Sequence, residues 1–215
     1  MELVEESAHV QDSLPPIGHW RDFPPLELPG ILLGALEVFT ARGYHGSSVR
    51  DLASKAGVTV PGLYYHYPSK QAVLVALLDT CISELVARAR AAHQAAEDTP
   101  RARFAHVVES IVLTVAHRSS LTVLDSELRY LDPENRRYYA GMRKELENLL
   151  LEVVRAGQRD HSFAVSLPED TTRALLGMFQ AVATWYDPDG PLPPEQIARR
   201  YVTISLHTVG ARPPA

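Results

Sequence analysis

The sequence predicts an all-α protein with an N-terminal domain of three helices and a larger C-terminal helical domain. Apolar residues recur at three- and four-residue spacing through most of the 215 residues, which is the period of an amphipathic helix. No stretch shows the alternation of apolar and polar residues that marks a half-buried strand. We therefore expect an arm over residues 1–27, a small domain over 28–75 and a helical domain over 76–215.

The arm is acidic and rich in proline. Residues 1–27 contain one basic residue, Arg21, against Glu2, Glu5, Glu6, Asp12, Asp22 and Glu27. We expect this arm to be disordered or loosely packed, with Trp20 and Phe23 packing against the body if it is ordered. Residues 28–70 instead carry Arg42, Arg50, Lys55 and Lys70 against two acids, so this block can attract an anion although the net charge of the chain is −5.

The first helix is predicted over residues 29–42, where apolar residues form one broad face. A second helix is predicted over 49–56, because Ser47 or Ser48 can cap its first turn. Gly57 then ends it, since glycine takes positive φ without a steric clash.

A third helix follows directly. Thr59 can cap it, Pro61 suits its first turn, and Pro68 ends it. Ala53 is a small residue at the point where these two short helices would cross. This combination is typical of a helix-turn-helix, whose second helix enters the major groove of DNA.

The residues from Ile31 to Leu78, above all AGVTVPGLYYHYPSKQAVL, resemble the DNA-binding domain of the TetR family of bacterial transcription regulators. The resemblance implies contacts with double-stranded operator DNA from Ser48, Arg50, Thr59, Val60, Pro61, Gly62, Tyr64, Tyr65, His66, Tyr67 and Lys70. It implies a base contact for Tyr65, a phosphate contact for Tyr64 and a phosphate anchor at Lys70. His66 is equally compatible with the core, and the ring of Tyr67 is expected to be buried.

Further helices are predicted over residues 70–96, 101–117, 121–131, 133–159, 169–186 and 194–209. The first of them follows Ser69, a candidate cap, and runs from the small domain into the large one. It can therefore transmit a change between the two domains.

The C-terminal domain is expected to enclose a small molecule. Candidate lining residues lie on helices that pack around its middle: Phe104, Val108, Ile111, Leu121, Leu124, Leu128, Arg129, Tyr138, Met142 and Phe179. Each apolar member is also compatible with an ordinary core position. The segment WYDPDG, residues 185–190, resembles a TetR subgroup whose effectors are acyl-CoA thioesters from fatty-acid, steroid or aromatic-acid breakdown. Arg129, Arg136 and Arg137 could meet CoA phosphates or lie on solvated surface.

The last two helices carry more apolar residues than one buried stripe needs. This surplus predicts that they pair with the same helices of a second subunit, as TetR-like proteins do. A two-fold dimer would match a palindromic operator.

Other classes of protein find little support. The sequence contains no window approaching eighteen consecutive apolar residues, so no membrane-spanning helix is expected. No secretory signal is expected at the N-terminus either. The single cysteine, Cys81, cannot form an internal disulfide, which suits the cytoplasm. His106, Glu109 and His117 lack a further ligand at a metal-binding spacing. No catalytic motif appears, so we expect no enzyme, no metal and no cofactor.

These observations predict a homodimeric transcriptional repressor that a small hydrophobic or acyl-CoA effector releases from DNA. One alternative is an activator or other DNA-binding regulator without a small ligand, which a filled C-terminal core would favour. The other is a helical small-molecule-binding protein or enzyme with a vestigial DNA-binding domain, which failure to bind any duplex would favour.

Overall fold

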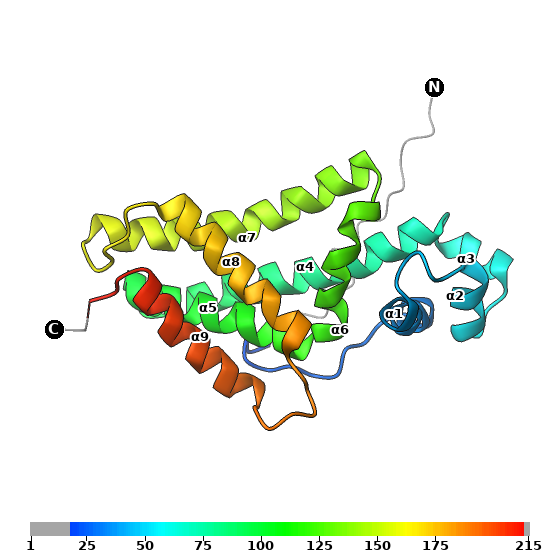
Figure 1. Ribbon diagram of the computed structural model, residues 1–215, viewed down its shortest axis with the longest axis horizontal. Coiled ribbons are helices and arrows are strands. Elements are labelled where there is room, and N and C mark those ends of the chain that lie inside the picture. Colours follow the sequence, from blue (N-terminus) through cyan, green and yellow to red (C-terminus); the bar gives the residue numbers. More distant parts are fainter. Residues whose placement is uncertain (1–17, 213–215) are drawn as a thin grey trace.

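The computed structural model describes residues 18–212, which are helical and contain no strand (Figure 1). The elements are α1 (Gly30–Arg42), α2 (Val49–Lys55), α3 (Val60–His66), α4 (Lys70–Ala95), α5 (Pro100–His117), α6 (Ser119–Thr122), the 3-10 helix η2 (Val123–Tyr130), α7 (Pro133–Arg159), α8 (Pro168–Trp185) and α9 (Pro194–Thr208). The predicted all-α fold is confirmed. Expectations for residues 1–17 lie outside the described residues.

The capping residues act where the sequence places them. Ser48 Oγ accepts from the Asp51 amide at 3.2 Å, while the Asp51 carboxylate accepts from the Ser48 amide at 2.8 Å, so the two residues form a capping box. Thr59 and Ser69 cap α3 and α4 through bonds of 3.1 and 3.0 Å to the Gly62 and Ala72 amides. Local hydrogen bonds therefore fix the starts of these three helices.

The predicted helix over 121–131 is only partly α-helical, because η2 replaces it from Val123. Polar side chains in this segment donate to backbone carbonyls one turn back: Thr122 Oγ1 to Arg118 O at 3.2 Å and Ser126 Oγ to Val123 O at 2.9 Å. Such bonds compete with regular α-helical pairing.

The three N-terminal helices pack closely at two points. Gly57 has φ of 69°, which confirms the predicted glycine turn between α2 and α3. Gly34 of α1 faces the end of α2, where a Cβ on Gly34 would lie 2.9 Å from the Ala56 nitrogen. Only glycine fits this approach. Leu52 and Leu63 are fully buried between the helices, as the apolar pattern indicates.

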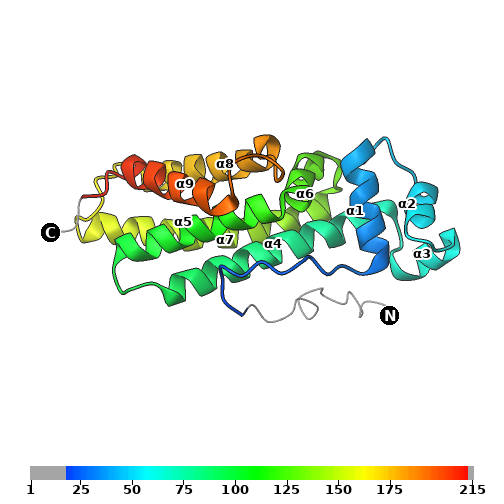
Figure 2. The same ribbon diagram turned by 90° about the horizontal axis from the view of Figure 1, so that it is seen from below.

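In the C-terminal domain, α5 is central and packs against α4, α7, α8 and α9. The long helices α4 and α7 run along the domain, and α8 and α9 cover α5 (Figures 1 and 2). Buried residues of α1 to α3 and of α4 to α9 belong to one continuous hydrophobic core. The helix α4 contributes to this core along most of its 26 residues.

Residues 18–29 lie along α4 and α5 before the chain enters α1 (Figure 2). Trp20 is 2% exposed, and the Phe23 ring stacks on His117 with ring centroids 4.2 Å apart. The expected packing of these two aromatic residues is confirmed. For residues 18–27, the expectation of a loosely packed arm is wrong, because buried arginines bind this segment through its backbone, as described below.

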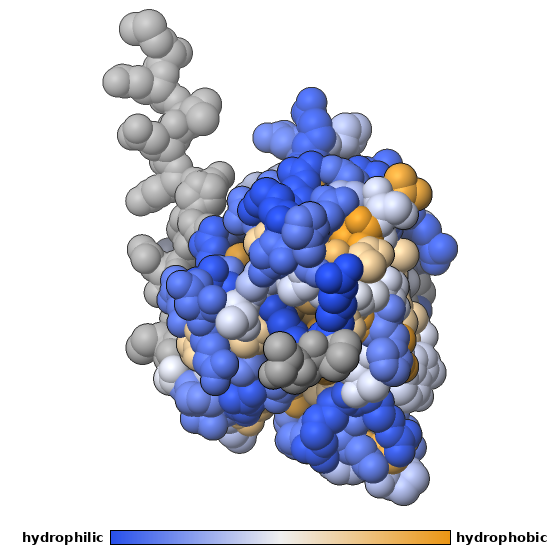
Figure 3. All heavy atoms as spheres, turned by 90° about the vertical axis from the view of Figure 1, so that its left-hand side faces the viewer, coloured by the Kyte–Doolittle hydropathy of each residue, from blue (hydrophilic) through white to orange (hydrophobic). Residues whose placement is uncertain are grey.

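The end of the molecule remote from α2 and α3 is mostly hydrophilic, with small scattered apolar areas (Figure 3). Within residues 18–212, no single helix is long and apolar enough to cross a membrane. The pair formed by residues 100–117 and 119–130 meets the criteria of length and composition together, but it is bent by 87°.

Candidate functional site

The first turn of α3 and the aromatic residues after it form an exposed surface at one end of the molecule. Tyr65 is 85% exposed and Tyr64 is 47% exposed. Thr59, Pro61 and His66 are also exposed, so His66 lies outside the core. Large aromatic side chains in solvent contribute little to folding, and they are available to a partner.

Two other predicted contact residues flank this surface on α2. Arg50 is exposed. Ser48 is exposed too, but its hydroxyl also donates to the Asp51 carboxylate at 2.6 Å. Hydrogen bonds from Ser48 lower the pKa of Asp51, and Arg42 at 3.1 Å lowers it further. Ser48 therefore caps α2 in addition to any contact with DNA.

Val60, Gly62 and Tyr67 are half-buried. Val60 and Tyr67 pack against the core, and burial raises the pKa of the Tyr67 hydroxyl. This position suits the expectation that the Tyr67 ring belongs to the core. Val60 offers only part of its surface to a partner.

Lys70 has a role that the sequence did not suggest. Its Nζ donates to Tyr44 O at 2.6 Å and to Ser47 O at 2.7 Å, and it lies 4.2 Å from the centre of the Tyr44 ring. These contacts use two of the three N–H groups of the ammonium. Partial burial lowers the pKa of Lys70, although Asp51 and Glu127 act in the opposite direction. Lys70 thus fixes the loop between α1 and α2, and its phosphate contact remains a prediction.

The same loop contacts the C-terminal domain. The Tyr44 amide donates to Glu127 Oε1 at 3.4 Å. The Tyr130 ring lies 6.0 Å from the Tyr44 ring and 4.0 Å from the His45 ring. Glu127 and Tyr130 both belong to η2, so this segment joins the two domains. Local sequence patterns could not predict this contact, because the two sides are more than eighty residues apart.

The predicted ligand-lining residues are mostly core. Phe104, Val108, Ile111, Leu121, Leu124 and Phe179 are at most 2% exposed. Leu128 is half-buried against the core, and Tyr138 donates to Asp79 Oδ1 at 2.8 Å. Burial first, and then Asp79, raise the pKa of Tyr138 to about 12.

The predicted arginines lie near η2. Arg129 is exposed, with its guanidinium 4.7 Å from the centre of the Tyr130 ring. Arg136 donates to the carbonyls of Arg129 and Leu131 at 3.0 Å each and so caps the end of η2. Arg137 is exposed. Arg136 is thus held by backbone hydrogen bonds, whereas Arg129 lies over an aromatic ring.

A small internal cavity of about 40 Å³ lies among α4, α5, η2, α7 and α8. Ile111 and Phe179 line it, together with the polar residues Thr122, Asp125, Tyr139, Arg143 and Gln180. The Tyr139 hydroxyl donates to Asp125 at 2.5 Å, and Arg143 lies 3.7 Å from the same carboxylate. Burial raises the pKa of both Asp125 and Tyr139. Cys81 also lines this cavity, and its thiol is buried as expected.

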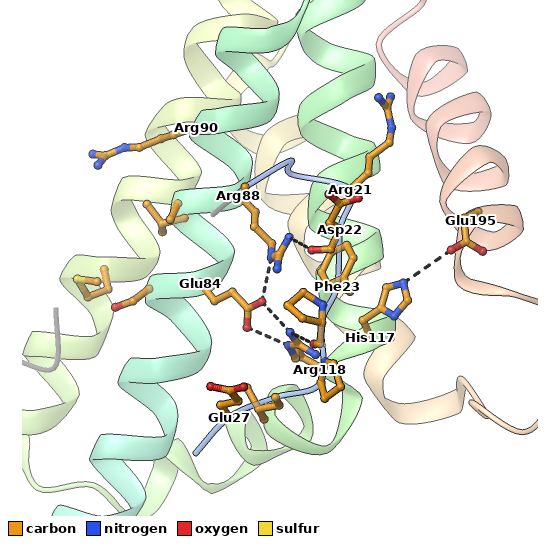
Figure 4. A pocket seen from close by; sticks show the side chains of 18 of the residues that line it. Arg21, Asp22, Phe23, Glu27, Glu84, Arg88, Arg90, His117, Arg118 and Glu195 are labelled. Carbon is orange, nitrogen blue, oxygen red and sulfur yellow. Dashed lines mark hydrogen bonds and ion pairs between the residues drawn. The ribbon is translucent and has the colours of Figure 1, made fainter. Parts of the chain in front are cut away.

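A larger groove of about 1110 Å³ surrounds the N-terminal segment, where Phe23 lies between α4 and α5 (Figure 4). Of the predicted ligand residues, only Met142 lines it. Its floor contains a buried ion cluster, since Glu84 accepts from Arg88 at 2.8 Å and from Arg118 at 2.9 Å. Sequence reasoning missed this cluster. A glutamate and an arginine four residues apart within the apolar α4 were the available signal.

Comparison with known proteins supports the assignment of both domains. Residues 31–77 match the family described as bacterial regulatory proteins, tetR family, and residues 97–209 match the tetracyclin repressor-like C-terminal domain. The chain is 26% identical to the HTH-type transcriptional repressor KstR2 of Rhodococcus jostii over 174 residues, which cover 80% of this chain and 85% of KstR2.

Solved structures give the same result. The TetR family transcriptional regulator PfmR from Thermus thermophilus aligns with a TM-score of 0.77 and 29% identity, covering 82% of this chain and 97% of PfmR. AibR in complex with isovaleryl coenzyme A and operator DNA aligns with a TM-score of 0.73 and 26% identity, covering 81% and 95%. The C-terminal match alone spans more than half of the sequence. The chain therefore belongs to the TetR family of bacterial DNA-binding transcription regulators and is not an enzyme.

Proposed function

We propose that this protein is a homodimeric repressor that binds a palindromic operator and is released from it by a small effector. The observation that carries the proposal is the exposure of Tyr64 and Tyr65 on a short helix whose first turn is held by the Thr59 cap. A rigid helix start with aromatic side chains in solvent suits contact with base edges and phosphates. Its similarity to a named repressor supports the direction of control. Both operator DNA and a reduced Cys81 fit action in the cytoplasm.

The outer face of α8 supports the dimer. Ala174, Gly177, Ala181 and Trp185 are exposed and recur every three or four residues, so they form one stripe. Small residues let two helices approach closely, and Ile204 of α9 adds an apolar side chain that is 45% exposed. We propose that this face pairs with itself across a two-fold axis.

Ala181→Arg tests the dimer, because it places a charge on this stripe without touching the DNA-binding helices. We expect light scattering to show a monomer at micromolar concentration. The control is Ala140→Arg, which replaces an exposed alanine of α7 and is expected to leave the mass unchanged. A dimer that survives Ala181→Arg would exclude this face.

We propose that the effector is hydrophobic or an acyl-CoA thioester and that its apolar part enters the internal cavity. The AibR complex with isovaleryl coenzyme A supports this class. Ligand pockets usually measure about 300–1000 Å³, whereas this cavity measures about 40 Å³. The effector must therefore open the core. A regulator without any small effector is the second candidate, and the closed core favours it.

We propose that η2 and α4 carry the change to the DNA-binding helices. Asp125 of η2 lines the cavity, and Glu127, two residues on, binds the loop between α1 and α2. Opening the cavity would displace η2 and with it this loop. To lower DNA occupancy a hundredfold, the effector must favour the released state by about 2.7 kcal/mol.

The test is fluorescence anisotropy on the palindromic DNA upstream of the coding region, at two salt concentrations, with and without acyl-CoA thioesters. We expect tight binding that one thioester reverses. Tight binding that no thioester affects would retain the regulator and remove the CoA effector. Absence of sequence-preferring binding would contradict the proposal.

A further inference from the structure

We propose that residues 20–24 form a strap that fixes the orientation of the DNA-binding domain, and that Arg88 and Arg118 are positioning residues for operator binding. This inference rests on the proposed operator binding. It adds to α4 a further connection between the two domains, on a different side of the molecule from the contact between η2 and the α1–α2 loop (Figure 2).

The strap is held through its backbone. Arg88 Nη1 donates to Trp20 O at 3.2 Å and to Asp22 O at 2.8 Å, and Arg118 Nη2 donates to Pro24 O at 3.0 Å. Figure 4 shows these two arginines reaching the strap, Arg88 from α4 and Arg118 from the position directly after α5. Because three carbonyls are bound in sequence, the strap cannot slide along the groove without breaking several hydrogen bonds.

The arginines are themselves fixed. Both bind Glu84, and the side chains of Glu84, Arg88 and Arg118 are only 7%, 5% and 8% exposed. Buried charges are costly unless all their hydrogen-bonding groups have partners. The two guanidinium groups carry more N–H donors than one carboxylate can accept, and the strap carbonyls accept from some of the others. The cluster and the strap therefore stabilise each other.

Aromatic side chains add to the hold. The Phe23 ring lies between the His117 ring, at 4.2 Å, and the Arg88 guanidinium, at 3.9 Å. Trp20 is buried, and Arg21 forms a paired contact with Glu109 of α5, with both N–O distances at 2.8 Å. The strap is therefore anchored at each end and in the middle.

The connection from the strap to α1 is short. Between Pro24 and Gly30 the chain can extend over at most about 22 Å, and prolines at positions 25 and 29 restrict it further. Leu26 and Leu28 along this stretch pack against the core. Since α1 packs directly on α2, the strap limits how far the whole DNA-binding domain can turn relative to α5.

The test lengthens this connection without touching either end. A Gly-Ser-Gly-Ser insertion between Leu26 and Glu27 leaves residues 20–24 and α1 unchanged in sequence but gives the connection between them four flexible residues of extra length. If the longer connection reduces the population of the binding-competent orientation to about a tenth, operator affinity falls about tenfold. We expect this loss with little change in the thermal midpoint. The control is the same insertion between Ser13 and Leu14, upstream of the strap, which is expected to bind like the parent protein.

A distance measurement gives a readout that does not need DNA. Spin labels at Ser54→Cys on α2 and Arg159→Cys at the end of α7, in labelled chain mixed with an excess of unlabelled chain so that one subunit of a dimer carries them, report the orientation of one domain against the other, and both positions are exposed. Cys81 is 4% exposed and will not take the label. We expect a broader distance distribution in the chain with the Leu26–Glu27 insertion than in the parent or the control.

Detaching the strap should have the same effect as lengthening the connection. Phe23→Ala is expected to weaken operator binding, and its effect should not add to that of the insertion. Parent-like affinity together with an unchanged distance distribution in the lengthened chain would overturn the proposal. So would equal losses from the control insertion. If the parent protein binds no duplex, the repressor proposal fails, and the distance distributions alone decide the role of the strap.

Discussion

In α3, the tyrosines at positions 64 and 65 extend into solvent, whereas in α5 and α8 Phe104 and Phe179 have no exposed surface. The two regions also differ in how they are fixed. Hydrogen bonds within a few residues hold α2 and α3, while α5 depends on packing against α4, α6, α7, α8 and α9. A short-range pattern can therefore locate these two helices and their caps, but long-range packing decides which residues line a cavity.

The largest expected effect lies on the buried side of this comparison. Glu84→Ala leaves Arg88 and Arg118 facing each other without a counter-charge, so we expect the free energy of unfolding to fall by about 3–5 kcal/mol. Urea denaturation measures it. Glu152→Ala, at an exposed position of α7, is the control and should change stability by less than about 0.5 kcal/mol. Equal effects of the two substitutions would mean that the cluster contributes nothing to stability.

The next effect belongs to the exposed side. Tyr65→Ala should weaken operator binding by about 1–3 kcal/mol, the range of a base contact, and leave the thermal midpoint unchanged because the ring is 85% exposed. Competition between operator and random duplex separates specific from general affinity. Tyr65→Phe tells whether the ring or the hydroxyl matters. A parent-like affinity of Tyr65→Ala would remove this residue from the DNA contact.

Lys70 lies on the boundary between the two regions. Lys70→Met releases the loop that carries Tyr44 and Ser47, so we expect operator affinity to fall about tenfold, or about 1.4 kcal/mol. Losing one phosphate contact changes the slope of log affinity against log salt by about 0.9 per subunit. We expect a smaller change in this slope, because two N–H groups of the Lys70 ammonium already donate to the backbone carbonyls of Tyr44 and Ser47. A full change of about 0.9 would make phosphate its main partner.

The smallest effect is a pH dependence at His117. Burial lowers the pKa of His117, Arg118 and Arg88 lower it further, and Glu195 and Glu84 raise it. The folded protein thus holds fewer protons on this imidazole than the unfolded chain. Its neutral form contributes stability above the unfolded pKa, about 6.5. That contribution is lost as pH falls through this value toward the lower folded pKa.

The measurement compares urea denaturation at pH 7.5 and pH 5.5 for the parent protein and for His117→Gln. The variant should lose less stability on acidification than the parent. Identical losses would show that the imidazole does not take part.

Sequence reasoning found the helices and their caps because these depend on neighbours in the chain. Ser48, Gly57 and Thr59 act locally, so their roles followed from spacing. It could not place Gly34, whose role depends on the backbone of α2, nor the contact between Glu127 and Tyr44. It also counted Phe104 and Leu121 as lining residues, although periodicity shows only that a residue faces inward and not whether space remains there.

One consequence of α4 concerns modularity. This helix is about 39 Å long at 1.5 Å per residue. Val73 and Leu74 near its start are as fully buried as Ala89 and Ala92 near its end. The boundary between the two domains therefore falls inside a single helix and a single core. We expect the protein to melt in one transition, and a chimaera with another effector domain must exchange whole helical packing partners rather than cut at a linker.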